Sequence, residues 1–325
     1  MIGNTSIAPE LREKLRLPLI GGPMFIATSP ALVIAQCTSG VIGSIPALNA
    51  RSTAELDEML SEIEEALAAH DAANPEQPAA PYSLNLVAHA SNPRLEPDLA
   101  LLLAHKVKLA IVSLAAPKDI VTAVHEYGGL VFNDVISNRH AEKCAEAGVD
   151  GLIAVCAGAG GHTGNMSPFA LVQELRAWWQ GPLALSGCIA TGQSILGALA
   201  MGADFAYIGS PFLASLEANT AHGFKEMVRT SDSRDVIVTN CFTGVNATFL
   251  RPSIEANGLD PAKLSRPEGA KISIADGGAN PKAWRDIWSA GQGIGAVHHV
   301  EPAADYIDRL VMEFDAARAA LRAWV

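Results

Sequence analysis

The feature that most constrains the fold is a regular alternation of short apolar runs with helical patterns. Eight runs of strand length follow one another, with helical segments between them. The predicted strands cover residues 18–24, 41–45, 82–87, 109–114, 130–135, 151–156, 182–187 and 205–209. Strands that alternate with helices predict a parallel sheet, and eight is the number that an α/β fold of the (β/α)8 TIM-barrel type requires.

A doubly wound sheet is the alternative α/β architecture. Such a sheet usually has fewer strands and carries its glycine fingerprint after the first strand. In this chain, glycine and polar residues follow many of the strands, at the carboxyl ends where a barrel builds its active site. The barrel is therefore the predicted fold. Its predicted helices include residues 30–39, 53–69, 95–105, 117–127 and 138–147.

The strand–helix alternation stops near the end of the eighth unit. Residues 216–281 contain mostly helical patches and loops, which predicts a smaller, mostly helical inserted domain that covers the barrel mouth as a substrate or lid domain. Residues 1–215 and 282–325 are predicted to form the barrel. The last predicted helix, residues 303–324, has one apolar face, and we expect that face to pack on the barrel. Its residues are Ile307, Leu310, Val311 and Phe314.

Charge and cysteine usage exclude several classes of function. The net charge of −11 has no compensating basic tract, which argues against nucleic-acid and anionic-membrane binding. The five cysteines are widely spaced without a Cys-x-x-Cys pair, so we predict neither a disulfide framework nor a metal site. The first residues lack the basic start and long apolar core of a signal peptide, so a cytoplasmic location is expected.

A glycine-dense loop with one histidine follows the sixth predicted strand. Residues 158–164 contain four glycines, and Gly160 and Gly161 directly precede His162. Glycines permit positive φ and close approach of the backbone to a ligand, and histidine exchanges a proton near neutral pH. The alternative interpretation is a flexible surface turn with a solvated histidine. The other strand ends favour the ligand-binding interpretation.

Two further turns have the position of a phosphate site. Ser186, Gly187 and Cys188 follow the seventh strand, and Gly209 and Ser210 follow the eighth. In barrels, the loops after these two strands often bind phosphate through backbone N–H groups. The alternative is a pair of ordinary strand-to-helix turns, but two such turns at these positions favour phosphate.

Other polar or special residues also lie on predicted strands. Gly22, Pro23 and Met24 end the first strand and predict a contact with a flat aromatic ring, although Met24 fits a core position equally well. Asn85 interrupts an apolar strand, so a ligand or a neighbouring turn must bond its amide if it is buried. Asp134 is a similar case, for which we expect a structural or supporting role.

Together these motifs resemble the nitronate monooxygenase family, formerly called 2-nitropropane dioxygenases. The resemblance covers nearly the whole chain. Its landmarks are residues 21–24, 39–40, Asn85, 160–164, 185–188, 201–210, 212–214 and 288–292. Members of this family are FMN-dependent (β/α)8 proteins, so the resemblance implies an FMN-binding barrel that acts on a small-molecule nitronate with O2.

The resemblance also implies roles for individual residues. His162 matches the family's active-site histidine, which would take the α-proton of a nitroalkane or hydrogen-bond the nitronate; imidazole suits both tasks near pH 7. The products would be a carbonyl compound and nitrite. The implied FMN-binding residues are Gly22, Pro23, Met24, Asn85, Gly160, Gly161, Ser186, Gly187, Cys188, Gly209, Ser210 and Gln292. A homo-oligomer is left open.

Three positions depart from the family pattern. Cys188 replaces the usual second glycine of the phosphate turn, Pro211 stands where many members have arginine, and Asp134 falls where some have lysine. These departures bear on the electron donor and the substrate. Two alternatives therefore stay open: an NAD(P)H-dependent FMN reductase of quinones or enoyl thioesters, and a non-catalytic flavin-binding barrel.

Overall fold

Eight parallel strands form the centre of the computed structural model, which describes residues 14–115, 118–264 and 282–323. They run around the sheet in the order β1-β8-β7-β6-β5-β4-β3-β2. Their bounds are β1 Leu19–Gly21, β2 Gly43–Pro46, β3 Tyr82–Val87, β4 Leu109–Ser113, β5 Leu130–Val135, β6 Gly151–Val155, β7 Leu183–Ser186 and β8 Phe205–Ile208. The N–H of Gly21 donates to the carbonyl of Ile42 (2.7 Å) and links the ends of this order. The predicted (β/α)8 barrel is confirmed.

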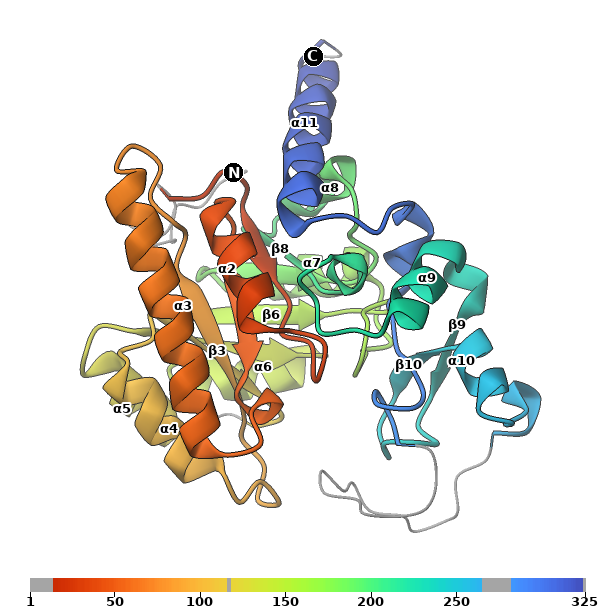
Figure 1. Cartoon of the computed structure of the whole chain (residues 1–325), viewed down its shortest axis with the longest axis horizontal. Helices are drawn as coiled ribbons and strands as arrows, with labels where there is room; N and C mark the ends of the chain where they lie inside the picture. The colour runs from red at the N-terminus through yellow and green to blue at the C-terminus, as the bar shows by residue number, and fades with distance from the viewer. Residues whose placement is uncertain (1–13, 116–117, 265–281, 324–325) are drawn as a thin grey trace.

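A ring of helices surrounds the strands (Figure 1). Their bounds are α2 Pro30–Thr38, α3 Thr53–Ala73, α4 Leu95–Ala104, α5 Lys118–His125, α6 Asn138–Glu146, α7 Pro168–Arg176, α8 Gly192–Met201 and α11 Ala303–Arg322. Residues 117 and 324 of the predicted helices lie outside the described residues. Alternate strand side chains point inward, and Ile111, Phe132, Ile153 and Phe205 belong to the buried cluster that fills the barrel.

Capping residues set the ends of the helices. Thr191 and Ser194 form a capping box at the start of α8, where each side chain accepts a hydrogen bond from the other residue's backbone. At the other end of α8, Gly202 has φ +112°, a left-handed conformation that favours glycine. The capping box thus bounds the loop after β7 at the barrel mouth, and Gly202 bounds the short turn to β8 at the opposite face.

An insertion separates β8 from its helix, α11. It contains η2 Ser210–Ala214, α9 His222–Thr230, η3 Ser233–Asp235, β9 Val236–Thr239, β10 Ala247–Leu250, α10 Arg251–Ala256, η4 Pro261–Lys263 and η5 Gln292–Ala296. The antiparallel pair β9–β10 is not part of the predicted helical pattern, although the Val-Ile-Val-Thr run of β9 is typical of a strand. Residues 265–281 of the predicted inserted domain lie outside the described residues.

We call residues 216–264 and 282–297 the cap. Phe249, Ile254 and Ile287 belong to a small core of its own. A second buried cluster crosses the boundary, because Leu213 from the barrel side packs in one cluster with Leu250 of the cap. The cap is therefore anchored to the barrel through shared apolar contacts. The predicted domain boundaries at 215/216 and 281/282 stay a prediction.

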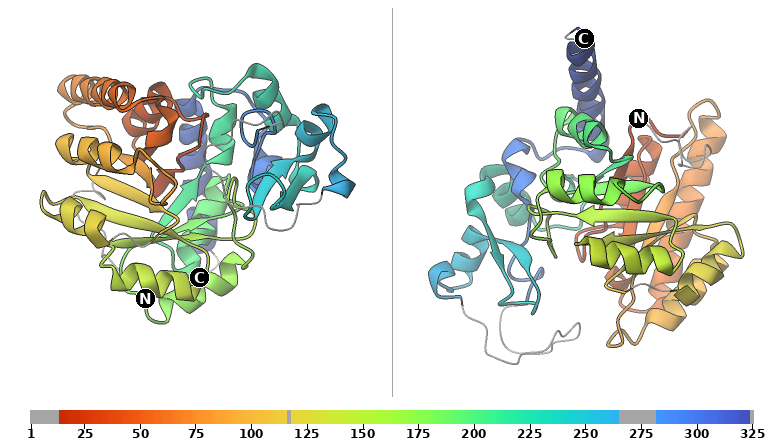
Figure 2. Two further views of the ribbon diagram at one scale, coloured as in Figure 1. Left: turned by 90° about the horizontal axis from the view of Figure 1, so that it is seen from below. Right: turned by 180° about the vertical axis from the view of Figure 1, so that it is seen from behind.

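Helix α11 completes the ring between α8 and α2. Its first half is buried through Tyr306, Ile307 and Leu310, and the hydroxyl of Tyr306 donates to the carbonyl of Ala190 (2.9 Å). Its second half extends away from the body of the molecule (Figure 2). No helix in the described part of the chain is long and apolar enough to cross a membrane.

Candidate active site

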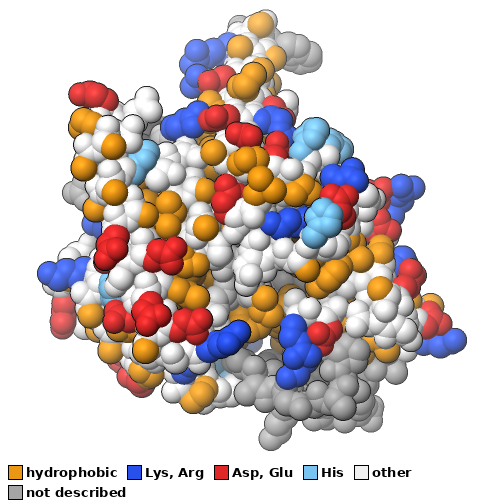
Figure 3. Space-filling view, in the orientation of Figure 1, with side chains coloured by type: hydrophobic (Ala, Val, Ile, Leu, Met, Phe, Trp, Pro, Cys, Tyr) orange, Lys and Arg blue, Asp and Glu red, His pale blue; other side chains and the backbone are white. Residues whose placement is uncertain are grey.

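A cavity of about 2090 Å³ opens at the carboxyl ends of the barrel strands. The molecular surface is hollowed between the barrel and the cap (Figure 3). The predicted site residues that line it are Gly22, Pro23, Met24, Asn85, Gly160, Gly161, His162, Ser186, Gly187, Cys188, Gly209 and Ser210. The barrel thus gathers residues from five strand ends and the loops that follow them, as the fold predicts.

The floor of the cavity is the last inward-pointing layer of the barrel. Because strand side chains alternate, the position two residues after each core residue also points inward. By this rule, Ser113, Asp134 and Tyr207 point inward above the core residues Ile111, Phe132 and Phe205, respectively. Ser113, Asp134 and Tyr207 all line the cavity. The floor therefore combines polar side chains on β3, β4 and β5 with an aromatic ring on β8.

Hydrogen bonds connect the polar residues of the floor. The Nδ2 of Asn85 donates to the carbonyl of Ile111 (3.1 Å) and to Oγ of Ser113 (2.9 Å). The hydroxyl of Ser113 in turn donates to Oδ2 of Asp134 (2.6 Å). Both donors of Asn85 are occupied, so its Oδ1 is the atom left to accept a hydrogen bond from a ligand.

Asp134 is unusual among these residues because its charge is poorly compensated. Oδ1 of Asp134 is buried without a hydrogen-bond partner among the described residues. Desolvation by burial raises the pKa of Asp134 to about 6, and the hydrogen bond from Ser113 offsets only part of that effect. The carboxyl group therefore changes its charge close to physiological pH.

The glycine loop after β6 is folded tightly against the next turn. Gly158 has φ +87°, and a side chain there would put its Cβ 2.2 Å from Sγ of Cys188. The N–H of Gln292 donates to the carbonyl of Gly158 (2.9 Å) and holds the loop from behind. Gln292 is not among the residues lining the cavity, and its Oε1 lies 3.9 Å from Sγ of Cys188.

The cap holds the backbone around His162. His162 forms an antiparallel bridge with Ala247, the first residue of β10. Next to it, Thr248 donates from its N–H to the carbonyl of Gly161 (2.9 Å), and the N–H of Gly161 donates to Oγ of Ser289 (3.0 Å). The loop is therefore positioned by hydrogen bonds to the cap on one side of the cavity.

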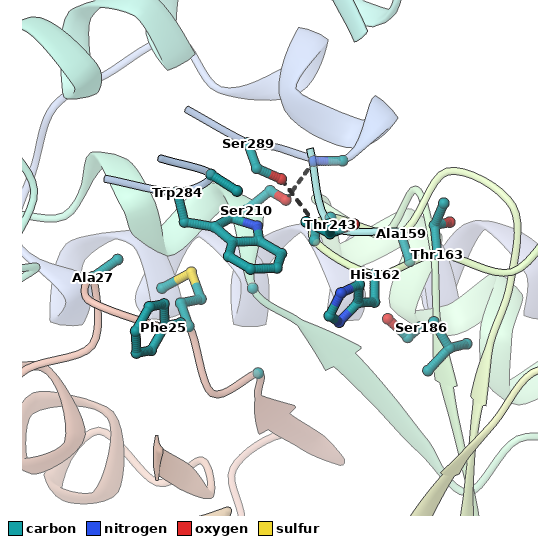
Figure 4. A pocket seen from close by; sticks show the side chains of 18 of the residues that line it. Phe25, Ala27, Ala159, His162, Thr163, Ser186, Ser210, Thr243, Trp284 and Ser289 are labelled. Carbon is teal, nitrogen blue, oxygen red and sulfur yellow. Dashed lines mark hydrogen bonds between the residues drawn. The ribbon is translucent and has the colours of Figure 1, made fainter. Parts of the chain in front are cut away.

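The imidazole of His162 is free to meet a ligand. No described residue hydrogen-bonds to its ring nitrogens, and the ring faces the cavity (Figure 4). Its centroid lies 5.0 Å from that of Trp284, with the two planes at 84°. Desolvation by the surrounding protein lowers the pKa of His162, so the ring is neutral at pH 7 and one nitrogen can accept a proton.

The turns after β7 and β8 present backbone donors. The N–H groups of Gly187, Cys188 and Gly209 have no hydrogen-bond partner within the described chain. Oγ of Ser210 accepts from the N–H of Gly291 (2.7 Å) and keeps its own proton for donation. Cys188 has φ +58°, so it adopts the left-handed conformation that suits the glycine usual at this position. Its Cβ therefore does not prevent the turn from forming.

The turn after β1 approaches β8 closely. The N–H of Gly22 donates to the carbonyl of Ile208 (2.7 Å), and a Cβ on Gly22 would lie 3.3 Å from the ring of Tyr207. Met24 is half-buried and faces Gly209, where an added Cβ would lie 3.6 Å from Cγ of Met24. A flat ligand can therefore approach the backbone at this corner of the cavity.

These features fit FMN. The unpaired turn amides suit its phosphate, the open corner beside Gly22 suits its ring, and Oδ1 of Asn85 suits an imide N–H. In the part of the chain described by the structure, no group of three His, Cys, Asp or Glu residues could hold a metal ion.

Several residues of the site lie outside the predicted set. Ser113 could have been found from strand alternation, because it lies two residues after the inward Ile111. Phe25 and Trp284 carry no comparable signal, since they reach the cavity from loops, and Ser289 lies in the landmark 288–292 without a predicted role.

An unbonded histidine faces the cavity beside turns that can bind phosphate, at the end of the strands where proteins of the (β/α)8-barrel class build their active sites. Comparison with known proteins gives the family within that class. The model of the nitronate monooxygenase family matches residues 10–313, so the chain belongs to this family of oxidoreductases.

Individual relatives agree with this assignment. A nitronate monooxygenase of Paraburkholderia phytofirmans is 28% identical over 295 residues, which cover 79% of each chain. A Mycobacterium tuberculosis protein with a monooxygenase name is 31% identical over 242 residues, which cover 70% of this chain and 64% of that protein.

A solved structure shares the fold. The nitroalkane oxidase of Streptomyces ansochromogenes has a TM-score of 0.77 at 20% identity, covering 95% of this chain and 99% of that one. At this identity the likeness shows the fold alone.

Proposed function

We propose that the protein is an FMN-dependent oxidoreductase that oxidises alkyl nitronates with O2 to carbonyl compounds and nitrite. The observation that carries this proposal is the unbonded, neutral imidazole of His162 above a floor that fits FMN. Membership of the nitronate monooxygenase family supports the same chemistry. When bound, FMN supplies the electron-accepting ring that the protein side chains lack.

The residues of this chain have separate tasks. The free N–H groups of Gly187, Cys188 and Gly209 bind the phosphate of the cofactor, and Asn85 accepts a hydrogen bond from its ring. His162 takes the α-proton of a neutral nitroalkane, or donates a hydrogen bond to a nitronate that is already ionised. The hydrogen bond that Thr248 donates to Gly161 and the one that Gly161 donates to Ser289 keep that imidazole at a constant position.

An anaerobic titration followed by the visible flavin spectrum tests the proposal. We expect an alkyl nitronate to reduce the FMN-loaded protein and NAD(P)H to leave it oxidised. His162→Ala should lower kcat/KM for a neutral nitroalkane by about 10²–10⁴-fold. His298→Ala is the matched control, because His298 is exposed and does not line the cavity.

Three results would reject the proposal. Fast reduction by NAD(P)H alone would place the protein among FMN reductases, with quinones and enoyl thioesters as the next substrates. FMN binding without reduction by either donor would indicate a non-catalytic flavin-binding barrel. Failure to bind FMN would exclude both flavoenzyme hypotheses.

A further inference from the structure

Two large aromatic side chains border the space at His162, Trp284 from the cap and Phe25 from the loop after β1. Trp284 contacts the imidazole edge to face, and the ring of Phe25 meets Trp284 with centroids 6.3 Å apart and planes at 85°. Figure 4 shows these three side chains around one space. On its other side, Trp284 packs on Phe249 of β10. We call Phe25 and Trp284 the aromatic wall.

Several of these apolar groups are exposed within the cavity. Phe25 is 46% exposed, and Leu114 and Ile136, which line the same cavity, are 42% and 48% exposed. Each leaves apolar area in contact with water that a ligand can cover, which is favourable in proportion to the area buried. Exposed apolar groups gathered in a concave site indicate a binding surface.

Backbone strain is concentrated at the same place. Among the described residues, five that are not glycine have positive φ, and four of them line the cavity: Ile26, Leu114, Cys188 and Trp284. Trp284 has φ +63°, and its N–H donates to the carbonyl of Ile287 (2.9 Å), which holds this conformation. Left-handed backbone is costly for such residues and persists where surrounding structure enforces it, typically at functional sites.

The size of the cavity leaves room for more than a cofactor. Its volume of about 2090 Å³ is roughly twice the upper end of the range of about 300–1,000 Å³ for small-molecule sites. The floor and the turns after β7 and β8 are the parts of the cavity that we assign to the cofactor. The aromatic wall, which borders His162 through Trp284, is left for the substrate.

We propose that the aromatic wall binds a bulky apolar group of the substrate and that Trp284 is the residue that determines this specificity. The inference rests on the proposed function and narrows its substrates to nitronates with a long alkyl or ring substituent. The apolar group lies against Trp284 and Phe25, and the nitronate head reaches the imidazole of His162.

Binding of linear alkyl carboxylates to the FMN-loaded protein tests this inference without turnover. A carboxylate shares the planar, two-oxygen anion of a nitronate. Calorimetric titration with acetate, butyrate, hexanoate, octanoate and decanoate should give a Kd that falls with chain length, by up to about fourfold for each CH2 group. Trp284→Ala should flatten this dependence, and Trp284→Phe should keep most of it.

Two further variants complete the experiment. Trp178→Ala is the matched control, because Trp178 lies at the end of α7, 38% exposed, and does not line the cavity; its chain-length dependence should equal that of the wild type. If circular dichroism shows that Trp284→Ala does not fold, Phe25→Ala takes its place. Phe25 is the other residue of the aromatic wall, and its exposed side chain can be shortened without loss of core packing.

The outcomes separate this inference from the proposed function. A Kd independent of chain length in the wild type would overturn the aromatic wall as a binding surface. An unchanged dependence in Trp284→Ala would overturn the role assigned to Trp284, and an unchanged dependence in Phe25→Ala, where that variant replaces it, would overturn the aromatic wall as the binding surface. Chain-dependent carboxylate binding with no nitronate turnover would reject the proposed reaction while leaving the apolar binding surface established.

Discussion

The imidazole of His162 depends on two kinds of contact, one through the backbone and one through the ring. The bridge to Ala247 fixes where the residue lies, and the contact with Trp284 excludes water from one side of the ring. Desolvation then lowers the pKa and keeps the ring neutral, which is the form that accepts a proton.

This environment predicts the pH dependence of the reaction. With a neutral nitroalkane as substrate, kcat/KM should decrease at low pH with a midpoint below 6.5, because protonation of His162 removes the base and its pKa is lowered from 6.5. Initial rates between pH 5 and 7.5 measure this. The decrease should persist in Asp134→Asn, which separates it from the titration of Asp134; a midpoint at or above pH 6.5 would contradict the assignment.

Cys188 gives a second prediction for a single residue. Its φ of +58° is costly for any residue with a Cβ, so Cys188→Gly should be more stable than Cys188→Ala by about 1 kcal/mol in the free energy of unfolding. The two variants lose the same thiol contacts and differ in the Cβ. Denaturant unfolding measures the difference, and equal stabilities would show that the turn relaxes to negative φ.

At the scale of elements, the register of β3, β4 and β5 decides which polar groups meet. Asn85 lies opposite Ile111 in the sheet, which brings its amide to Ser113. Ser113 then reaches Asp134 on the next strand. Three residues from separate strands thus form one hydrogen-bonded floor.

The buried carboxyl group of this hydrogen-bonded floor predicts that the stability of the fold depends on pH. The folded protein raises the pKa of Asp134 from 3.8 to about 6, so its ionised form destabilises the fold above that range, and below pH 4 the effect disappears. Asp134→Asn should therefore have a larger free energy of unfolding than the wild type at pH 8. The difference is at most about 3 kcal/mol, and solvent in the cavity screens the carboxylate and makes it smaller. Unfolding at pH 4 and pH 8 tests this, with Glu142→Gln on the exposed side of α6 as control. A gain of equal size at both pH values would contradict the explanation.

At the scale of the whole molecule, the cap and the barrel share a buried core. Leu213 on the barrel side belongs to one cluster with Phe224, Leu250 and Ile294 of the cap. Because this cluster joins the two regions, loss of packing in the cap also destabilises the barrel mouth.

We therefore expect the protein to unfold in one cooperative transition. Leu250→Ala, at a fully buried position of β10, should lower the free energy of unfolding by about 2–5 kcal/mol without splitting the transition. Val238→Ala, at an exposed position of β9, should change it by less than about 1 kcal/mol. Calorimetry measures both; a separate cap transition in Leu250→Ala would show that the cap folds independently.

The sequence alone determined the barrel and most strand ends around the cavity. Alternation of apolar runs with helical patterns is a local property, and the glycines before His162 and the turns ending at Cys188 and Ser210 fall at recognisable positions after strands. These residues could be predicted because neighbours in the chain specify them. Their roles toward a cofactor and substrate stay predictions.

Only the tertiary structure decided the contacts between distant segments. The bond from Ser113 to Asp134 depends on strand register, and the contact of Trp284 with His162 depends on how the cap returns to the barrel. The same return places Gln292 behind the glycine loop and not on the cavity wall. Such contacts depend on the packing free energy between segments that are far apart in the chain. The local hydrophobic periodicity of the sequence does not contain this information.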